Sequence, residues 1–283
     1  MKTNTIHCGE CAKTMRRHIP DNSVDLTVTS PPYDDLREYN GYTFEFEPIA
    51  AELWRVTKPG GAVVWVVADA TVKGSETGTS FKQALGFIGL GFRLHDTMIY
   101  EAKKAPLTHN RYEQSFEYMF VFSKGRLKTF NGIEINRTYS DNRTRSFFRR
   151  EKDGSKDSGF RGKKPKVLKY NVWRYVPNGG NSTKDKYAHQ HPAIFPEALA
   201  RDHIISWSNP GDIVLDPMCG SGTTLKMAVE QGREYIGIDI SQEYVSLAEK
   251  RVSGARVPLP GFGDVVKDEK VRPIFNQLEL VRQ

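Results

Sequence analysis

The sequence has few cysteines and no long apolar run, and each absence narrows the class of protein. Three cysteines among 283 residues are too few for a disulfide framework, so we expect a chain that folds in a reducing, intracellular compartment. Cys8 and Cys11 form a C-x-x-C pair without a second pair or a histidine at ligand spacing, so no metal site is expected and Cys11 is interpreted as a buried residue at a helix start. No run of 18 apolar residues and no apolar N-terminal signal segment occur, so neither a membrane span nor export is expected.

Length and periodicity predict one α/β core interrupted by an insertion. A chain of 32.1 kDa can bury such a core without disulfides or metals, and no internal repeat is visible. Apolar runs predict strands at 26–29, 62–67, 92–100, 117–122, 213–215 and 235–238, and helical spacing predicts helices at 49–56, 81–90, 197–205, 223–230 and 243–252. Residues after Gly254 have no clear period, and no role is assigned to them.

The most specific feature is a glycine turn between a predicted strand and a predicted helix, Asp216-Pro217-Met218-Cys219-Gly220-Ser221-Gly222-Thr223-Thr224. Its two glycines allow a tight bend and a close approach of the backbone to a ligand. The following strand ends at Asp239, 19 residues after Gly220, the spacing at which a nucleotide-binding βαβ unit places a carboxylate on a ribose diol. The turn lacks the Gly-Lys-Ser/Thr of a phosphate-binding loop. It therefore favours a ligand with a ribose and no phosphates, such as S-adenosylmethionine, over the alternative of an ordinary glycine-rich turn.

A second motif, Thr29-Ser30-Pro31-Pro32-Tyr33, follows the first predicted core strand. The two prolines fix φ and push Ser30 into an extended conformation, which makes the loop stiff. A delocalised exocyclic amine of a base is a poor nucleophile, so its methylation needs hydrogen-bond acceptors that hold it in line with the methyl group. Ser30 and the loop carbonyls can accept these bonds, and Tyr33 offers a face on which a flipped base can stack. By itself the motif would equally suit a polyproline-like turn or a peptide ligand.

Positive charge is concentrated in one segment. Residues 124–186 contain 18 Lys and Arg against 6 Asp and Glu, a local excess of 12, while the whole chain carries +7 and the remainder therefore −5. An excess confined to one segment is typical of a phosphate-binding surface, although a basic patch can also be a solvated face. We expect this segment to bind double-stranded DNA, and residues 154–166 are predicted to form a loop that orders on DNA. The candidate DNA contacts are Arg143, Arg145, Arg149, Arg150, Lys163 and Lys164.

Several segments, in order, resemble the amino-group DNA methyltransferases of the permuted β type, in which the catalytic loop precedes the cofactor loop. They are Gly9-Glu10-Cys11, Ser30-Pro31-Pro32-Tyr33, the stretch from Arg55 to Gly61, the stretch from Tyr112 to Lys124, His191-Pro192-Ala193-Ile194-Phe195-Pro196 and the glycine turn. The resemblance implies a Rossmann-like, circularly permuted methyltransferase sheet with an inserted target-recognition region. It divides the chain into a catalytic half (1–123), the basic insert (124–188), a cofactor-binding half (189–253) and a C-terminal extension (254–283).

The same resemblance assigns roles to residues. Ser30, Pro31, Pro32 and Tyr33 would be catalytic, and S-adenosylmethionine would be bound by Glu10, Phe195, Pro196, Asp216, Pro217, Cys219, Gly220, Ser221, Gly222, Thr223 and Asp239. Phe195 and Pro196 would close the methionine end of the cofactor. Glu10 stands where the family usually has Asp, so its hydrogen bond to the cofactor adenine would be differently placed. A cognate restriction endonuclease, a monomeric or homodimeric state and a prokaryotic or phage origin in the cytoplasm belong to the same expectation.

The base and the substrate class stay open at this point. In the resembling family Ser before Pro-Pro-Tyr usually accompanies cytosine N4 and Asp accompanies adenine N6, so cytosine N4 is the first expectation and adenine N6 the second. Methylation of cytosine carbon 5 needs a thiolate, and none of the 15 prolines is followed by cysteine, which argues against it. An RNA or protein methyltransferase would share both loops, and a non-catalytic DNA-binding protein would need only the basic insert.

Overall fold

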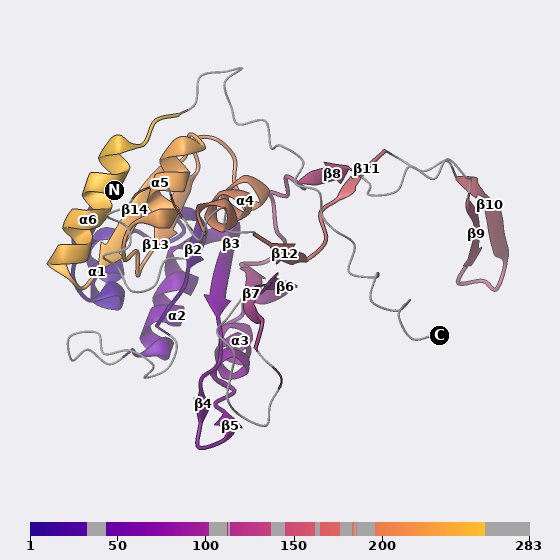
Figure 1. Ribbon diagram of the computed structural model, residues 1–283, viewed down its shortest axis with the longest axis horizontal. Helices are drawn as coiled ribbons and strands as arrows, with labels where there is room; N and C mark the ends of the chain where they lie inside the picture. The colour runs from indigo at the N-terminus through magenta and orange to yellow at the C-terminus, as the bar shows by residue number, and fades with distance from the viewer. Residues whose placement is uncertain are drawn as a thin grey trace, which may run out of the picture. The chain divides into compact units, whose positions relative to one another are not determined.

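The computed structural model describes residues 1–32, 44–101, 112, 114–136, 145–161, 165–175, 183, 185 and 196–257 (Figure 1). Side chains are described in these ranges except at strand residues 145–148, 150, 157 and 159–161. The chain forms two compact units. The first comprises Met1–Asn131 and Tyr170–Pro258, and the second comprises Gly132–Lys169 and Leu259–Gln283.

An eight-stranded sheet forms the centre of the first unit, in the order β1-β14-β13-β2-β3-β7-β6-β12. Its strands are β1 (Thr5–Cys8), β2 (Val24–Thr29), β3 (Thr57–Val67), β6 (Arg93–Glu101), β7 (Phe116–Ser123), β12 (Val172–Arg174), β13 (Ile213–Asp216) and β14 (Glu234–Asp239). β7 is antiparallel to both its neighbours, and the other pairs in this sheet are parallel. The first unit also contains a short hairpin of β4 (Thr71–Val72) and β5 (Ser75–Glu76).

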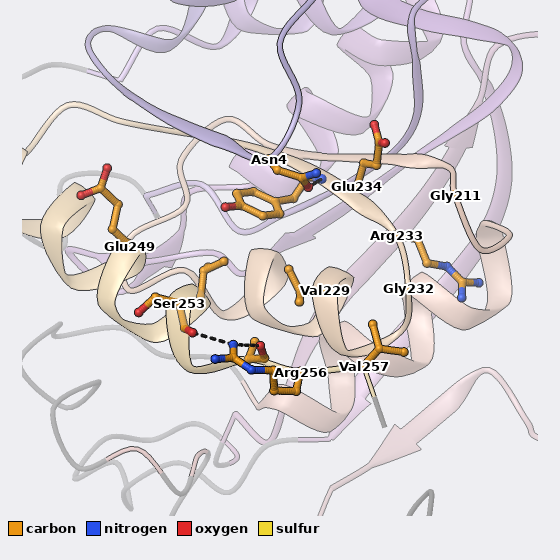
Figure 2. A pocket seen from close by; sticks show the side chains of 13 residues that line it. Asn4, Gly211, Val229, Gly232, Arg233, Glu234, Glu249, Ser253, Arg256 and Val257 are labelled. Carbon is orange, nitrogen blue, oxygen red and sulfur yellow. Dashed lines mark hydrogen bonds between the residues drawn. The ribbon is translucent and has the colours of Figure 1, made fainter. Parts of the chain in front are cut away.

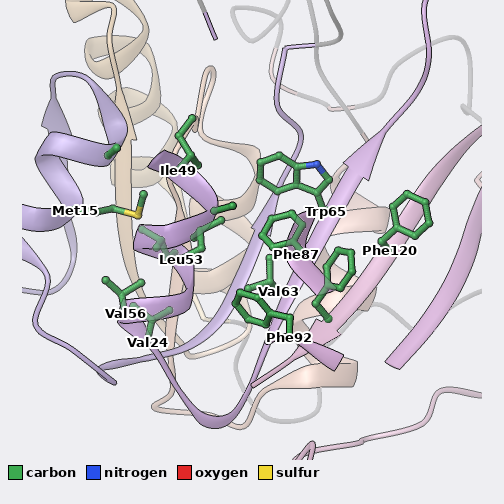
Figure 3. Packing of buried hydrophobic residues seen from close by; sticks show 14 of the residues in the cluster. Met15, Val24, Ile49, Leu53, Val56, Val63, Trp65, Phe87, Phe92 and Phe120 are labelled. Atoms are coloured by element: carbon green, nitrogen blue, oxygen red, sulfur yellow. The ribbon is translucent and has the colours of Figure 1, made fainter. Parts of the chain in front are cut away.

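Helices cover both faces of this sheet. They are α1 (Cys11–His18), α2 (Phe46–Val56), α3 (Thr79–Gly89), α4 (Glu197–Trp207), α5 (Thr223–Glu230) and α6 (Gln242–Gly254). Because strand side chains alternate between faces, Trp65 of β3 packs with Leu53 and Phe87 on the side of α1, α2 and α3 (Figure 3), whereas Val64 packs on the side of α4 and α5. A strand buried on both faces needs a nearly continuous apolar run, which the sequence of β3 supplies. Among the described helices, none is long and apolar enough to cross a membrane.

The order of the strands creates a switch point between β13 and β2. From β2 the chain passes through α2 to β3 on one side, and from β13 it passes through α5 to β14 on the other. The carboxyl ends of β13 and β2 therefore lie side by side at one edge of the sheet, the place where ligands bind in open α/β sheets. The glycine turn follows the first of these ends and the Pro-Pro loop follows the second.

The expected α/β class and all eleven predicted core elements are confirmed, most within two or three residues of their predicted ends. β1, β4, β5 and β12 have no counterpart in the prediction, and for α1 only a helix start at Cys11 was expected. Cys11 is the first residue of α1, as interpreted from the sequence, but it is half-buried and not buried. The domain boundaries predicted at 124, 189 and 254 stay predictions.

The second unit contains two hairpins, one of β8 (Glu134–Asn136) with β11 (Lys166–Leu168) and one of β9 (Arg145–Arg150) with β10 (Lys156–Arg161). The prediction of a loop over 154–166 is wrong for residues 156–161, which pair with β9. Gly154, with φ of +84°, belongs to the turn, where the backbone N–H of Ser155 donates to the carboxylate of Asp153 at 2.9 Å. Asp-Gly is a hairpin-turn pair, but β10 lacks the alternation of apolar residues that would have predicted a strand.

Candidate active site

A buried hydrogen bond joins the two loops that the sequence singled out. Asp216 is the last residue of β13, and its Oδ1 accepts from the hydroxyl of Thr29 at 2.8 Å and from the backbone N–H of Met218 at 3.2 Å. Thr29 is the last residue of β2, so the next residue, Ser30, begins the Pro-Pro loop. The first residue of the glycine turn is thus tied directly to the head of the predicted catalytic loop.

Asp216 also has unusual acid–base properties. Burial raises the pKa of its carboxyl to about 6, with a smaller contribution from the nearby charge of Asp239, while the bonds donated by Thr29 and Met218 act in the opposite direction. The carboxyl therefore changes charge close to neutral pH inside the protein. Among the candidate site residues, Cys219 is also buried, and burial raises the pKa of its thiol.

The glycine turn curls over the end of β14. The backbone N–H of Gly220 donates to Oδ2 of Asp239 at 2.8 Å, and that of Cys219 donates to the carbonyl of Ile238 at 2.9 Å. Gly222 precedes α5 with φ of +77°, and a Cβ at this position would lie 2.8 Å from the Cβ of Ala248. Only glycine fits both the backbone conformation and the close packing against α6.

Asp239 is held by two backbone donors. Besides the bond from Gly220, its Oδ1 accepts from the N–H of Ser241 at 2.9 Å. The predicted role of Asp239 toward a ribose diol stays a prediction.

The N-terminal motif lies beside this carboxylate. The backbone N–H of Gly9 donates to the carbonyl of Asp239 at 2.9 Å. The carboxylate of Glu10 caps α1, because it accepts from the N–H groups of Ala12 at 2.7 Å and Lys13 at 2.9 Å. Its predicted contact with the cofactor adenine stays a prediction.

The remaining predicted site residues fall in three groups. Ser30 and Pro32 are half-buried and Pro31 is buried directly after β2, and Pro196 is the N-cap residue of α4. Pro217, Ser221 and Thr223 are buried in or next to the glycine turn. Tyr33 and Phe195, and Arg143, Lys163 and Lys164 of the basic segment, lie outside the described residues.

The candidate DNA contacts that the structure includes belong to the second unit. Arg145, Arg149 and Arg150 lie on β9, and the exposed guanidinium of Arg149 lies 3.6 Å from the carboxylate of Glu151. The side chains of Arg145 and Arg150 are not described.

Sequence reasoning missed Arg251 of α6, whose side chain is completely buried against the glycine turn. Its Nη1 donates to the carbonyl of Ser221 at 2.8 Å and to the hydroxyl of Thr223 at 3.0 Å. A signal was present, because Arg251 follows Ala248 by three residues on the apolar stripe of the helix, where a charged residue is unexpected.

A pocket elsewhere in the first unit is separate from this site. It is lined by Gly211, Gly232 and Glu234 at the amino ends of β13 and β14, and by Ser253 and Arg256 near the end of α6 (Figure 2). Parallel strands place their amino and carboxyl ends at opposite edges of the sheet, so the pocket lies across the sheet from Asp216 and Asp239.

The strand order of the sheet, the glycine turn after β13 and the carboxylate at the end of β14 define the fold of the S-adenosylmethionine-dependent methyltransferases. The order of the motifs along the chain is permuted, because the Pro-Pro loop precedes the glycine turn. Within this class, residues 24–250 match the N6_N4_Mtase family, described as DNA methylase. The chain belongs to this family of DNA methylases.

Known proteins agree with this assignment. The chain is 57% identical to the orphan methyltransferase M.BamHII of Bacillus amyloliquefaciens over 84% of this chain and 92% of that protein. It is 27% identical to the DNA adenine methyltransferase YhdJ of Escherichia coli over 90% of this chain and 84% of that protein. The cytosine-N4-specific PvuII DNA methyltransferase has a similar fold, with a TM-score of 0.64, 19% identity and coverage of 89% of this chain and 86% of that one. A complex of M1.HpyAVI with S-adenosylmethionine matches with a TM-score of 0.59, 23% identity and coverage of 87% and 98%.

Proposed function

We propose that this DNA methyltransferase transfers a methyl group from S-adenosylmethionine to the exocyclic N4 amine of cytosine in duplex DNA. The observation that carries the proposal is the 2.8 Å hydrogen bond between Thr29 and Asp216. It brings a loop suited to an amine substrate next to a loop suited to a nucleoside cofactor, at the switch point of the sheet. Ser30, as the head residue of Pro-Pro-Tyr, supports cytosine as the target base.

The cofactor supplies an electrophilic methyl group on a sulfonium, and the residues of the chain bind and orient it. Asp239 would accept hydrogen bonds from the ribose diol, and the turn from Gly220 to Gly222 would let the backbone approach the cofactor closely. Asp216 and the segment of Phe195 and Pro196 would surround the methionine end. The buried bond from Thr29 keeps the cofactor side and the substrate side in a fixed relation.

On the substrate side, the protein raises the reactivity of the amine by accepting its hydrogen bonds. Ser30 and the carbonyls of the Pro-Pro loop would accept from the NH₂ group, and Tyr33 would stack on the base after it leaves the helix. As the nitrogen–carbon bond forms and the sulfur–carbon bond breaks, the sulfonium would become a neutral thioether, and the amine would release one proton to water. No covalent bond to the enzyme is needed, in contrast to methylation at carbon 5.

Adenine N6 is the second candidate base. The 27% identity to a DNA adenine methyltransferase over 90% of this chain supports it. Ser and Asp at the head of the loop both accept a hydrogen bond from an NH₂ group, so either amine is chemically accessible.

The basic segment of residues 124–186 would supply DNA affinity and sequence choice in the bacterial cytoplasm. The relative that is 57% identical is described as an orphan methyltransferase, whereas M.BglII of Bacillus subtilis, 28% identical, is described as a type II methyltransferase. The first relative supports action without a cognate nuclease and the second supports action beside one. Co-expression of the genes flanking this one, followed by a cleavage assay on unmethylated DNA, separates these cases.

Incubation of the purified chain with labelled S-adenosylmethionine and duplex DNA, RNA or protein tests the proposed substrate. We expect label in DNA alone and 4-methylcytosine after digestion to nucleosides. 6-Methyladenine would favour the second candidate, and 5-methylcytosine would overturn the mechanism. Label in RNA or protein instead of DNA would show that the substrate belongs to one of those classes.

A further inference from the structure

Arg251 lies at the centre of a buried polar cluster behind the glycine turn. Its Nη1 donates to the carbonyl and hydroxyl of Ser221 at 2.8 and 2.9 Å and to the hydroxyl of Thr223 at 3.0 Å. Its Nη2 donates to Oε1 of Glu197 at 2.8 Å, and its Nε donates to Oδ2 of Asp185 at 3.1 Å. One guanidinium therefore joins the turn to two acidic residues from a different part of the chain.

The two sides of this cluster correspond to the two walls of the proposed cofactor site. Ser221 and Thr223 belong to the glycine turn. Glu197 is the first residue of α4 and directly follows Pro196, which is expected at the methionine end of the cofactor. The side chain of Arg251 is 0% exposed, so it acts through the turn and through α4 and does not itself face the ligand.

Charge balance explains a second cation in this cluster but does not explain why that cation is an arginine. Lys226 already donates to Asp185 at 2.9 Å and to Glu197 at 2.8 Å. Lys226 balances one of these two negative charges, and either a lysine or an arginine could balance the other. A guanidinium differs from an ammonium in presenting five N–H donors in a rigid plane, and here these donors reach the turn and the carboxylates at the same time.

We propose that Arg251 is a positioning residue that fixes the glycine turn relative to the start of α4 and thereby sets the width of the cofactor site. The inference rests on the proposed binding of S-adenosylmethionine at this turn. Substitution of Arg251 should weaken cofactor binding even where the fold is retained, because both walls stay present but are no longer held at a fixed separation.

Arg233 offers a matched control. It is also a buried arginine of the first unit, and its bonds go to Ser208 and to the carbonyl of Gln231. These bonds lie at the amino end of β14, across the sheet from the cofactor turn. Arg233→Lys and Arg233→Gln should therefore lower stability through a comparable loss of buried hydrogen bonds without a specific effect on the cofactor.

Titration calorimetry of the whole chain with S-adenosylmethionine, at a temperature where circular dichroism reports each variant folded, tests the proposal. We expect Arg251→Gln and Arg251→Lys to raise Kd at least tenfold, and Glu197→Gln, which removes the negative charge of the anchor on α4, to raise it several-fold. The Arg233 variants should stay within twofold of the wild type. Arg251→Lys keeps the charge and provides the measurement if Arg251→Gln does not fold.

Two outcomes overturn the inference. One is a Kd within twofold of wild type for Arg251→Lys, and the other is an equal increase in the Arg233 variants. Failure of the proposed function would look different, because the wild-type chain would then bind no S-adenosylmethionine.

Discussion

The carboxyl of Asp216 links acidity to stability at the scale of one residue. Its pKa is about 6 in the folded chain against 3.8 as the ordinary value. A raised pKa means that the folded state binds the proton more tightly than the unfolded state, so this contribution to stability is complete below about pH 4 and is lost as pH rises through about 6. The charged form is then held in a site that disfavours it.

Asp216→Asn should remove this pH dependence while keeping an oxygen that accepts from Thr29. We therefore compare the unfolding free energy of the variant minus that of wild type at two pH values. This difference should be about 1 to 2 kcal/mol larger at pH 7.5 than at pH 5, since one pKa unit corresponds to about 1.4 kcal/mol. Urea unfolding at a series of pH values measures it. A difference between the two proteins that is constant with pH would contradict the assignment of the raised pKa to Asp216.

Substitutions of Ser30 and Asp239 should affect different quantities, because Ser30 is expected to contact the target base and Asp239 the cofactor. Ser30→Ala should slow methyl transfer about fivefold and leave the Kd of S-adenosylmethionine nearly unchanged, since one neutral hydrogen bond contributes about 1 kcal/mol. Asp239→Ala should weaken cofactor binding by about 1.5 to 3 kcal/mol, the range for bonds to a charged acceptor. Calorimetry and single-turnover transfer separate the effects. A folded Asp239→Ala chain with wild-type affinity would remove Asp239 from the cofactor site.

The residues with fixed spacing could be predicted from the sequence, and the others could not. Asp216, Gly220 and Asp239 are recognisable because a βαβ unit fixes their separation along the chain. Arg251 contributes through bonds to residues 54 and 66 positions away in the chain. Such a contact depends on how α6 and α4 pack, which no local pattern records.

The same distinction holds at the scale of elements. Strands such as β3, whose side chains are buried on both faces, carry an apolar run that marks them in the sequence. β1 has only four residues, and α1 has only Ala12 and Met15 buried. The strands β9 and β10 are rich in charged residues, so no strand was predicted for β9 and a loop was predicted over β10.

Packing between the glycine turn and α6 can be tested with a pair of glycines. Gly222→Ala would place a Cβ 2.8 Å from the Cβ and 3.0 Å from the Cα of Ala248, and its φ is +77°. Gly232 has φ of +72° with no atom within 4 Å of an added Cβ. Both substitutions should lose about 1 kcal/mol from the backbone conformation. Gly222→Ala should lose a further 1 to 3 kcal/mol from overpacking and should also weaken cofactor binding. Thermal unfolding measures the loss of stability, and calorimetry measures the loss of cofactor affinity. Equal losses of stability at the two positions would show that α6 shifts to accommodate the added methyl group.

For the whole molecule, the sequence predicted that the Pro-Pro loop and the glycine turn belong to one site, but it did not predict how DNA is read. The position of the two loops at one edge of the sheet follows from strand order, which a permuted arrangement of known motifs implies. The basic segment has no comparable pattern, and its charge alone indicates a partner with phosphates without specifying a base sequence.

The excess of 12 positive charges in residues 124–186 should govern how DNA binding depends on salt. Replacement of Arg143, Arg145, Arg149 and Arg150 with Gln should reduce the slope of log K against log salt by about one for each phosphate that the variant no longer neutralises, because fewer counterions are released. A control variant removes the same charge from exposed positions of the first unit, with Gln at Lys13, Arg17, Lys73 and Lys82. Fluorescence anisotropy with a duplex between 50 and 200 mM salt compares them. We expect the control to keep nearly the wild-type slope, since those cations lie outside the segment that we assign to DNA. Equal slopes for all three proteins would mean that the basic segment is a solvated face and that DNA affinity comes from the methyltransferase core.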